Sequence, residues 1–177
     1  MKKNIIIYGL IGGIVGSASM LFAVNYISHC EGNVDYNTSL FIGYASMLVA
    51  LSLVFIGIRN YRDKYNEGVI GFGRAFKIGI MMVLIASTIY AVAWVVDSMF
   101  FIPDFAEKFS AHTLEELRAS GAGQAEIDKQ TKEMANFVTN FKSPLFNAMM
   151  AYAEILPVGL VVTLISSAIL KRETPKK

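Results

Sequence analysis

The sequence predicts an all-α fold, namely a four-helix transmembrane bundle with a periplasmic helical hairpin between the third and fourth helices. Three observations support this prediction. The 177-residue chain is 54% hydrophobic and 17% charged, whereas soluble domains are about 45–50% apolar and about 25% charged. Four apolar stretches approach or exceed the roughly 20 residues that a spanning helix needs. The polar segment before the fourth stretch carries helix signals of its own.

The apolar stretches place the membrane helices within a single domain that covers 1–177. We expect these helices at about 5–27, 36–58, 76–99 and 144–170. Their apolar and polar residues do not alternate as in β-strands, and the stretches are longer than barrel strands of about 9–11 residues. The first stretch follows Lys2 and Lys3, as a secretory signal would. Because its apolar run exceeds the usual ~7–15 residues of such signals, we expect a retained helix.

Basic residues predict the orientation, because Lys and Arg in short loops favour the cytoplasmic side. The first expected loop contains no Lys or Arg. Four basic residues of the next loop would also attract anionic lipid headgroups: Arg59, Arg62, Lys64 and Arg74. We therefore expect both termini in the cytoplasm and the segment 100–142 outside it, with the lipid bilayer as the main partner.

The segment 100–142 is expected to hold two helices. The motif TLEE at 113–116 has the form of a capping box, so a helix should begin at Thr113. The motif SGAG then breaks it, and a second helix should cover Gln124–Phe141, whose apolar residues recur near one face. Ser143 and Pro144 supply an N-cap and a first-turn proline for the last membrane helix.

Glycines in the first apolar stretch form two overlapping GxxxG spacings, which let helices approach closely. The pairs are Gly9 with Gly13 and Gly12 with Gly16. Two interpretations stay open. The stripe packs either inside the bundle or between two copies of the chain, and the second interpretation predicts a homo-oligomer.

One carboxylate, Glu154, lies inside the fourth apolar stretch, roughly 15 Å along the helix and so near the middle of the bilayer. A charge there costs several kcal/mol unless it is compensated. Pro157 should free a carbonyl and kink the helix beside it. Tyr90 and Tyr152 are polar enough to hydrogen-bond to Glu154. Asp97, at the outer end of the third helix, is expected to cap that helix or to contact water.

Three interpretations of this candidate intramembrane polar site stay open. The carboxylate forms a structural hydrogen bond, handles ions or protons, or binds a ligand. Enzyme signatures such as HExxH, GxSxG and the P-loop are absent from the sequence. The single cysteine, Cys30, allows no intrachain disulfide and no CxxC site. The net charge of +2, without a basic stripe, does not suggest nucleic-acid binding. We expect no enzyme activity, no cofactor and no metal site.

Several motifs resemble a known family. The segments "FIGIRNYRDKYNEGVIGFGRAFKIGI", "IYAVAW", "PDFAEKF" and "EILPVGLVVTLISSAILKR" are similar to the bacterial membrane family called domain of unknown function 4199. The resemblance covers nearly the whole chain. It implies four membrane helices with an outer insertion, an inner-membrane location and no established activity. The pairing of Glu154 with Pro157 resembles a recurring feature of the family.

These observations lead to two functional hypotheses. The favoured one is a non-enzymatic structural or accessory component of the inner membrane, which self-associates or binds a periplasmic protein through the 113–141 hairpin. The alternative is a small transporter, or an ion- or proton-coupled membrane protein, that uses Glu154.

Overall fold

The computed structural model describes residues 2–29 and 36–172, with the side chains of 2–24, 41 and 43–172. These residues form helices, turns and one isolated β-bridge, between Ile70 and Arg172. In chain order the helices are α1 (Lys2–His29), α2 (Tyr36–Tyr65), α3 (Phe72–Phe100), α4 (Phe105–Ala119), α5 (Gln124–Phe141) and α6 (Pro144–Leu170).

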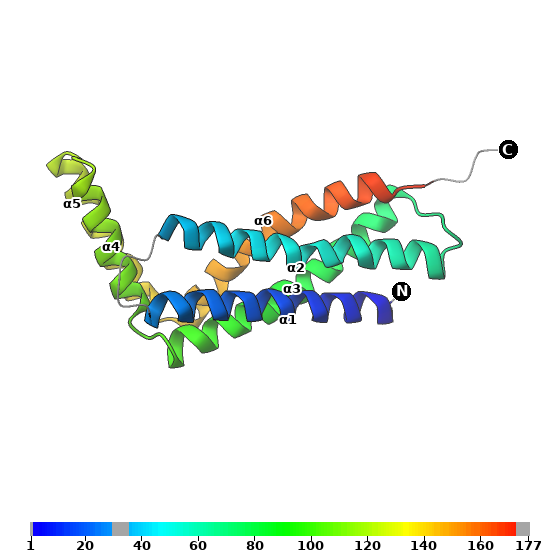
Figure 1. Ribbon diagram of the computed structural model, residues 1–177, viewed down its shortest axis with the longest axis horizontal. Coiled ribbons are helices and arrows are strands. Elements are labelled where there is room, and N and C mark those ends of the chain that lie inside the picture. Colours follow the sequence, from blue (N-terminus) through cyan, green and yellow to red (C-terminus); the bar gives the residue numbers. More distant parts are fainter. Residues whose placement is uncertain (1, 30–35, 173–177) are drawn as a thin grey trace.

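The long helices α1, α2, α3 and α6 form a bundle (Figure 1). α3 packs most extensively against α6 and α1, while α1 also packs against α2, and α2 against α6. The start of α1, the α2–α3 connection and the end of α6 lie at one end of the bundle, which we call the loop end. The helices α4 and α5 attach at the other end, which we call the hairpin end.

Among the described residues, four helical segments are long and apolar enough to cross a membrane. They are Lys2–Val24, Gly43–Tyr65, Phe72–Phe100 and Pro144–Leu170. This confirms the predicted all-α, four-helix transmembrane architecture. Large apolar side chains such as Ile14, Val49 and Ile169 are exposed on the outside of the bundle, where lipid would solvate them.

The expected basic loop is largely helical. α2 continues to Tyr65 and α3 begins at Phe72, so the α2–α3 connection is shorter than the apolar stretches suggested. Its basic residues therefore stand on the ends of two helices: Arg59, Arg62 and Lys64 on α2, and Arg74 on α3.

The glycine stripe of α1 packs inside the bundle. Gly9 and Gly13 lie against α3, and Gly12 and Gly16 lie against α2. A Cβ atom placed on Gly13 would lie 2.8 Å from Cδ1 of Ile89, which is closer than carbon atoms pack. Of the two interpretations drawn from the sequence, packing within one chain is the one that the structure shows.

Small residues also bring α3 and α6 together. A Cβ atom on Gly79 would lie 2.7 Å from Cγ2 of Thr163, and one on Gly159 would clash with Val83. Pro157 lies inside α6, and the helix continues through it to Leu170. The missing N–H of Pro157 leaves the carbonyl of the preceding turn without its usual helical donor.

The start of the hairpin differs from the prediction. α4 begins at Phe105, and Thr113 lies in its interior, where its hydroxyl donates to the Phe109 carbonyl at 2.8 Å. The predicted capping box is therefore wrong. Glu116, its expected partner, instead lies 3.2 Å from Nε2 of His112, one turn back on the same helix.

Local charge and aromatic burial explain the earlier start of α4. Asp104 occupies the N-cap position, and its carboxylate lies 2.7 Å from the Lys108 ammonium. This hydrogen bond holds the pKa of Asp104 below its ordinary value. Phe105 and Phe109 stack on each other and pack on rings of other helices. Packing these two partly buried rings against other helices favours helix over 105–112.

The second hairpin helix and the start of α6 agree with the prediction. α5 covers Gln124–Phe141. Ser143 is the N-cap of α6, its hydroxyl accepts from the Phe146 amide at 3.5 Å, and Pro144 occupies the first turn. Figure 1 shows α4 and α5 side by side and steeply inclined to the long helices, so the hairpin reaches sideways beyond the bundle.

Candidate functional site

Glu154 lies in α6, the helix that packs against α3 and α2. Val158, one helical turn further along and therefore on the same face, packs against the core. Glu154 itself is exposed. About ten residues separate it from the start of α6, which places it roughly 15 Å along the helix. In the part of the chain that the structure describes, its carboxylate accepts no hydrogen bond and pairs with no cation.

Two tyrosines from other helices lie near this carboxylate. Tyr90 of α3 is buried, and its ring lies beside Gly16 of α1. The Glu154 carboxylate and the Tyr44 hydroxyl of α2 both lie within electrostatic range of the Tyr90 hydroxyl. The hydrogen bond between Tyr90 and Glu154 that the sequence suggested is not formed among the described residues. No pattern in the sequence singled out Tyr44, because its role depends on how α2 lies against α6.

Tyr152 does not join Glu154. Its hydroxyl oxygen lies 2.7 Å from the Thr88 hydroxyl of α3. Thr88 also donates to the Leu84 carbonyl at 2.8 Å, so its single proton is used there and Tyr152 is the donor of the pair. The expected hydrogen bond from Tyr152 to Glu154 is therefore not formed.

A second polar cluster lies at the hairpin end. Asp97, which we expected to cap α3 or to contact water, is only 3% exposed. Its backbone carbonyl accepts from the amides of Phe101 and Ile102 at 2.9 and 3.0 Å. The fully buried Asn147 donates from Nδ2 to the Phe141 carbonyl at 2.8 Å and to the Ser98 hydroxyl at 3.4 Å.

The sequence analysis missed Asn147. The residue lies on the face of α6 that carries Ala151 and Ile155, at spacings of four, and this face is buried. A polar side chain on the apolar face of a membrane helix is a signal that could have identified it.

Six rings join the hairpin to the bundle. We call them the aromatic cluster: Trp94, Phe105, Phe109, Phe137, Phe141 and Phe146. They come from α3, α4, α5 and α6. Trp94 meets Phe105 edge to face with ring centres 5.4 Å apart, and Phe105 stacks on Phe141 at 5.8 Å. Such pairs add about 0.5–1.5 kcal/mol each beyond the burial of their surface.

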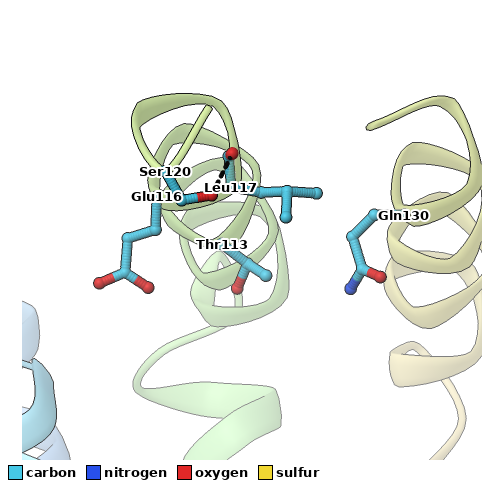
Figure 2. A pocket seen from close by; sticks show the side chains of 5 residues that line it. All are labelled: Thr113, Glu116, Leu117, Ser120 and Gln130. Atoms are coloured by element: carbon cyan, nitrogen blue, oxygen red, sulfur yellow. Dashed lines mark hydrogen bonds between the residues drawn. The ribbon is translucent and has the colours of Figure 1, made fainter. Parts of the chain in front are cut away.

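A shallow groove of about 420 Å³ runs between α4 and α5. Its lining residues are Thr113, Glu116, Leu117, Ser120 and Gln130. Figure 2 shows Leu117 directed toward Gln130 across the groove, and Glu116 on the other side of α4. The hydroxyls of Thr113 and Ser120 donate to carbonyls of their own helix. Glu116 and Gln130 therefore carry the polar groups that can turn toward another molecule.

The predicted basic residues divide into two kinds at the loop end. Arg62 donates from Nη1 to the Leu170 carbonyl at 3.3 Å and from Nε to Asp63 at 2.7 Å, so it holds the end of α6. Arg74 donates to the Asn66 side chain at 3.1 Å. Arg59 and Lys64 are exposed.

These features define the class of the protein: a helical bundle with candidate membrane-spanning helices and a helical hairpin at one end. Among the described residues, no three His, Cys, Asp or Glu side chains gather as a metal site would require. The chain belongs to the family described as "Protein of unknown function (DUF4199)", whose profile matches residues 7–172. This confirms the resemblance seen in the sequence. No curated protein and no solved structure matches the chain.

Proposed function

We propose that this protein is a non-enzymatic accessory component of the bacterial inner membrane. In this proposal both termini lie in the cytoplasm, and the α4–α5 hairpin presents a contact surface to a protein in the periplasm. The carrying observation is that the hairpin is fixed to the bundle at its base and exposed along most of its length.

The base of the hairpin has two kinds of attachment. The aromatic cluster packs rings from both hairpin helices against α3 and α6. The buried hydrogen bond from Asn147 to the Phe141 carbonyl ties the end of α5 to the start of α6. A segment that only connected two membrane helices would not need such contacts. Fixing its direction lowers the entropy that is lost when a partner binds.

The groove is the part of the hairpin best suited to a partner. Its lining residues include the apolar Leu117, which points toward the Gln130 amide, and the Glu116 carboxylate on the other side of α4. A photo-reactive residue at Gln130 should therefore crosslink to one discrete protein in living cells. The matched control is Lys132, which is exposed on the same helix but roughly 200° around its axis.

The crosslinking experiment distinguishes self-association of the chain from binding of a different protein. An adduct of twice the 19.5 kDa chain mass would identify a second copy, and any other discrete mass would identify a different partner. Weaker crosslinking in a Glu116→Lys background would place the contact in the groove. Equal crosslinking from Gln130 and Lys132, or none from either with the protein correctly in the membrane, would refute the hairpin as a contact surface.

The orientation is tested separately by labelling single cysteines. In a Cys30→Ser background, a cysteine at Glu126 of the hairpin should react in intact cells with a maleimide that crosses only the outer membrane. A cysteine at Lys64, at the loop end, should react only after the inner membrane is opened. The reverse pattern would overturn the proposed orientation.

A second candidate function is ion- or proton-coupled transport around Glu154. The exposed position of Glu154 within an apolar span, without a cationic partner among the described residues, favours it. Flux of protons or a co-substrate in proteoliposomes should then be lost in Glu154→Gln while the protein still folds. An unchanged flux in that variant would remove this candidate.

A further inference from the structure

The two ends of the bundle carry opposite net charge. At the hairpin end, eight acidic residues outnumber five basic ones over 97–142. The loop end has nine basic side chains and only two acidic ones among the described residues, so it is a strongly cationic surface. The acidic residues of the loop end are Asp63 and Glu67, and the basic ones are Lys2, Lys3, Arg59, Arg62, Lys64, Arg74, Lys77, Lys171 and Arg172.

A backbone bridge joins the α2–α3 connection to the end of α6 at this surface. Ile70, just before α3, and Arg172, just after α6, exchange two hydrogen bonds, from each amide to the other carbonyl, at 2.9 and 2.8 Å. Residues paired in this way have their Cα atoms about 5.5 Å apart. The Arg172 side chain is exposed. The bridge therefore holds this cation beside the connection 66–71.

Arg74 is held against the same connection. Its guanidinium donates from Nη1 to the Asn66 side-chain oxygen at 3.1 Å, and Asn66 donates in turn to the Val69 carbonyl. Val69 directly precedes Ile70, the residue that is bridged to Arg172. Two arginines that lie far apart in the sequence thus flank one short segment, the first from α3 and the second from the end of α6.

Both arginines have hydrogen-bond donors to spare. A guanidinium carries five N–H donors, and Arg74 uses one of them within the connection. The Arg172 side chain makes no hydrogen bond or ion pair with the described residues. The Asp63 carboxylate is occupied by Arg62, at 2.7 Å. Glu67 is exposed, and among the described residues it pairs with neither arginine. The surplus positive charge is therefore available to an anion that does not belong to this chain.

The surroundings of the two arginines indicate which anion fits. They lie within two residues of the ends of the candidate spans Phe72–Phe100 and Pro144–Leu170, which is the depth of lipid headgroups. Exposed apolar side chains adjoin them, since Phe72 is 41% and Ile169 is 65% exposed. Guanidinium groups bind phosphate oxygens through paired hydrogen bonds. An anionic phospholipid offers a phosphate and acyl chains together, whereas a soluble phosphate would use the charges alone.

We propose that Arg74 and Arg172 form a binding site for the phosphate of an anionic phospholipid. The two guanidinium groups hold one phosphate between α3 and the end of α6, and the acyl chains lie along the exposed apolar side chains of the spans. A general attraction of this end for headgroups would involve all its cations alike, whereas the site depends on two of them. The inference depends neither on the hairpin nor on Glu154.

The experiment measures lipid binding to the purified full chain by native mass spectrometry, with dioleoyl phosphatidylglycerol and dioleoyl phosphatidylcholine as probes. We expect phosphatidylglycerol to bind about tenfold more tightly, because the choline cation opposes the surplus positive charge. Arg74→Gln and Arg172→Gln should each weaken phosphatidylglycerol binding by about tenfold, through loss of charge-assisted hydrogen bonds. The matched control is Lys64→Gln, which removes the same charge from an exposed position at the same end.

The control and the double variant distinguish a site from diffuse attraction. Lys64→Gln should weaken phosphatidylglycerol binding by less than about twofold, because an exposed charge outside the site contributes little. The double variant of Arg74 and Arg172 should lose less than the product of the two single losses, because both side chains hold the same phosphate.

Several results would overturn the proposal. One is that phosphatidylglycerol binds no more tightly than phosphatidylcholine. Another is that Lys64→Gln weakens binding as much as either arginine variant, or that the two single losses multiply in the double variant. Complete displacement of phosphatidylglycerol by millimolar inorganic phosphate would identify a soluble anion as the occupant instead of a lipid.

A second measurement uses the unmodified chain and so does not depend on the folding of variants. In nanodiscs, replacing phosphatidylcholine with phosphatidylglycerol should slow amide hydrogen exchange severalfold in the connection 66–71 and in the last turn of α6. A bound phosphate would tie together the two sides of the backbone bridge, so these amides would open less often. Exchange in α5 is the internal control and should not change. Equal exchange at the bridge in both lipids would overturn the site.

Discussion

Tyr152 donates a hydrogen bond to Thr88 across the seam between α6 and α3, with the two oxygens 2.7 Å apart. The Thr88 hydroxyl in turn donates a hydrogen bond to the Leu84 carbonyl at 2.8 Å. The chain of donors thus ends on a backbone acceptor, and neither hydroxyl is left unpaired in the apolar span. Glu154 lies within one turn of Tyr152 but has no hydrogen-bond partner among the described residues. Tyr152 therefore belongs to a structural polar pair, whereas Glu154 is a candidate functional residue.

Removing this pair should cost little stability and the two changes should not add. We expect Tyr152→Phe and Thr88→Val each to lower the free energy of unfolding by about 0.6 kcal/mol, the usual value for hydrogen bonds between membrane helices. The double variant should lose less than the sum of the two single changes, because both remove the same bond. Unfolding in mixed micelles measures this, and strictly additive losses would show that the two hydroxyls do not interact.

The glycine stripe of α1 gives a prediction with an internal control. Gly13→Ala should destabilise the fold by about 1–3 kcal/mol, because its new Cβ would overlap Ile89. Gly43→Ala, also in a helix but with open space around it, should be neutral or stabilise by about 0.5–1 kcal/mol. Thermal unfolding of both variants tests this. If Gly13→Ala changed the oligomeric mass and left the melting temperature unchanged, the stripe would pack between copies instead.

Much of the fold was predictable because length and apolarity identify membrane helices in a sequence. The long spans, the α5 range and the Ser143 cap all follow from local signals. The start of α4 does not, because Phe105 packs against Trp94 and Phe141. Those contacts lie far apart in the sequence, and they outweigh the local TLEE motif. The glycine spacing similarly predicted close packing but did not reveal which helix would fill it.

The sequence predicted how deep in the membrane the candidate site lies, but not toward which side of the bundle its side chains point. The position of Glu154 within its apolar stretch gives its depth, but its exposure depends on how the other helices pack against α6. The expected hydrogen bond from Tyr152 to Glu154 could have been ruled out from the sequence. Residues two apart on a helix lie roughly 200° apart around its axis, so Tyr152 and Glu154 point to different sides. Tyr90 lies on another helix and has no such restriction.

Asn147 should be the residue that fixes the hairpin. Replacing it with Ala removes the donor to the Phe141 carbonyl and leaves that buried acceptor unpaired, at a cost of about 1–3 kcal/mol. We also expect faster hydrogen exchange in α4 and α5, while exchange in α1 changes little. The matched control is Asn140→Ala, because Asn140 is exposed and directly precedes Phe141, the last residue of α5. Equal effects of the two substitutions would contradict this role.

Arg62 should stabilise the end of α6 in a way that its neighbour Arg59 does not. The Arg62 side chain is 18% exposed and binds both the Leu170 carbonyl and Asp63, whereas Arg59 is 65% exposed and only reaches Asp63, at 3.6 Å. A cation at a helix C-terminus also interacts favourably with the helix dipole. We expect Arg62→Ala to cost about 1–2 kcal/mol and Arg59→Ala about 0.5 kcal/mol or less.

Arg62→Lys should restore only part of this loss, because an ammonium lacks the planar fork that reaches two acceptors at once. Hydrogen exchange of the last turn of α6 gives a local measurement beside the melting temperature. The exchange rate there should rise in Arg62→Ala and stay unchanged in Arg59→Ala. If both variants lost the same stability, the basic residues at this end would act only through their charge, and the contact with Leu170 would have no separate role.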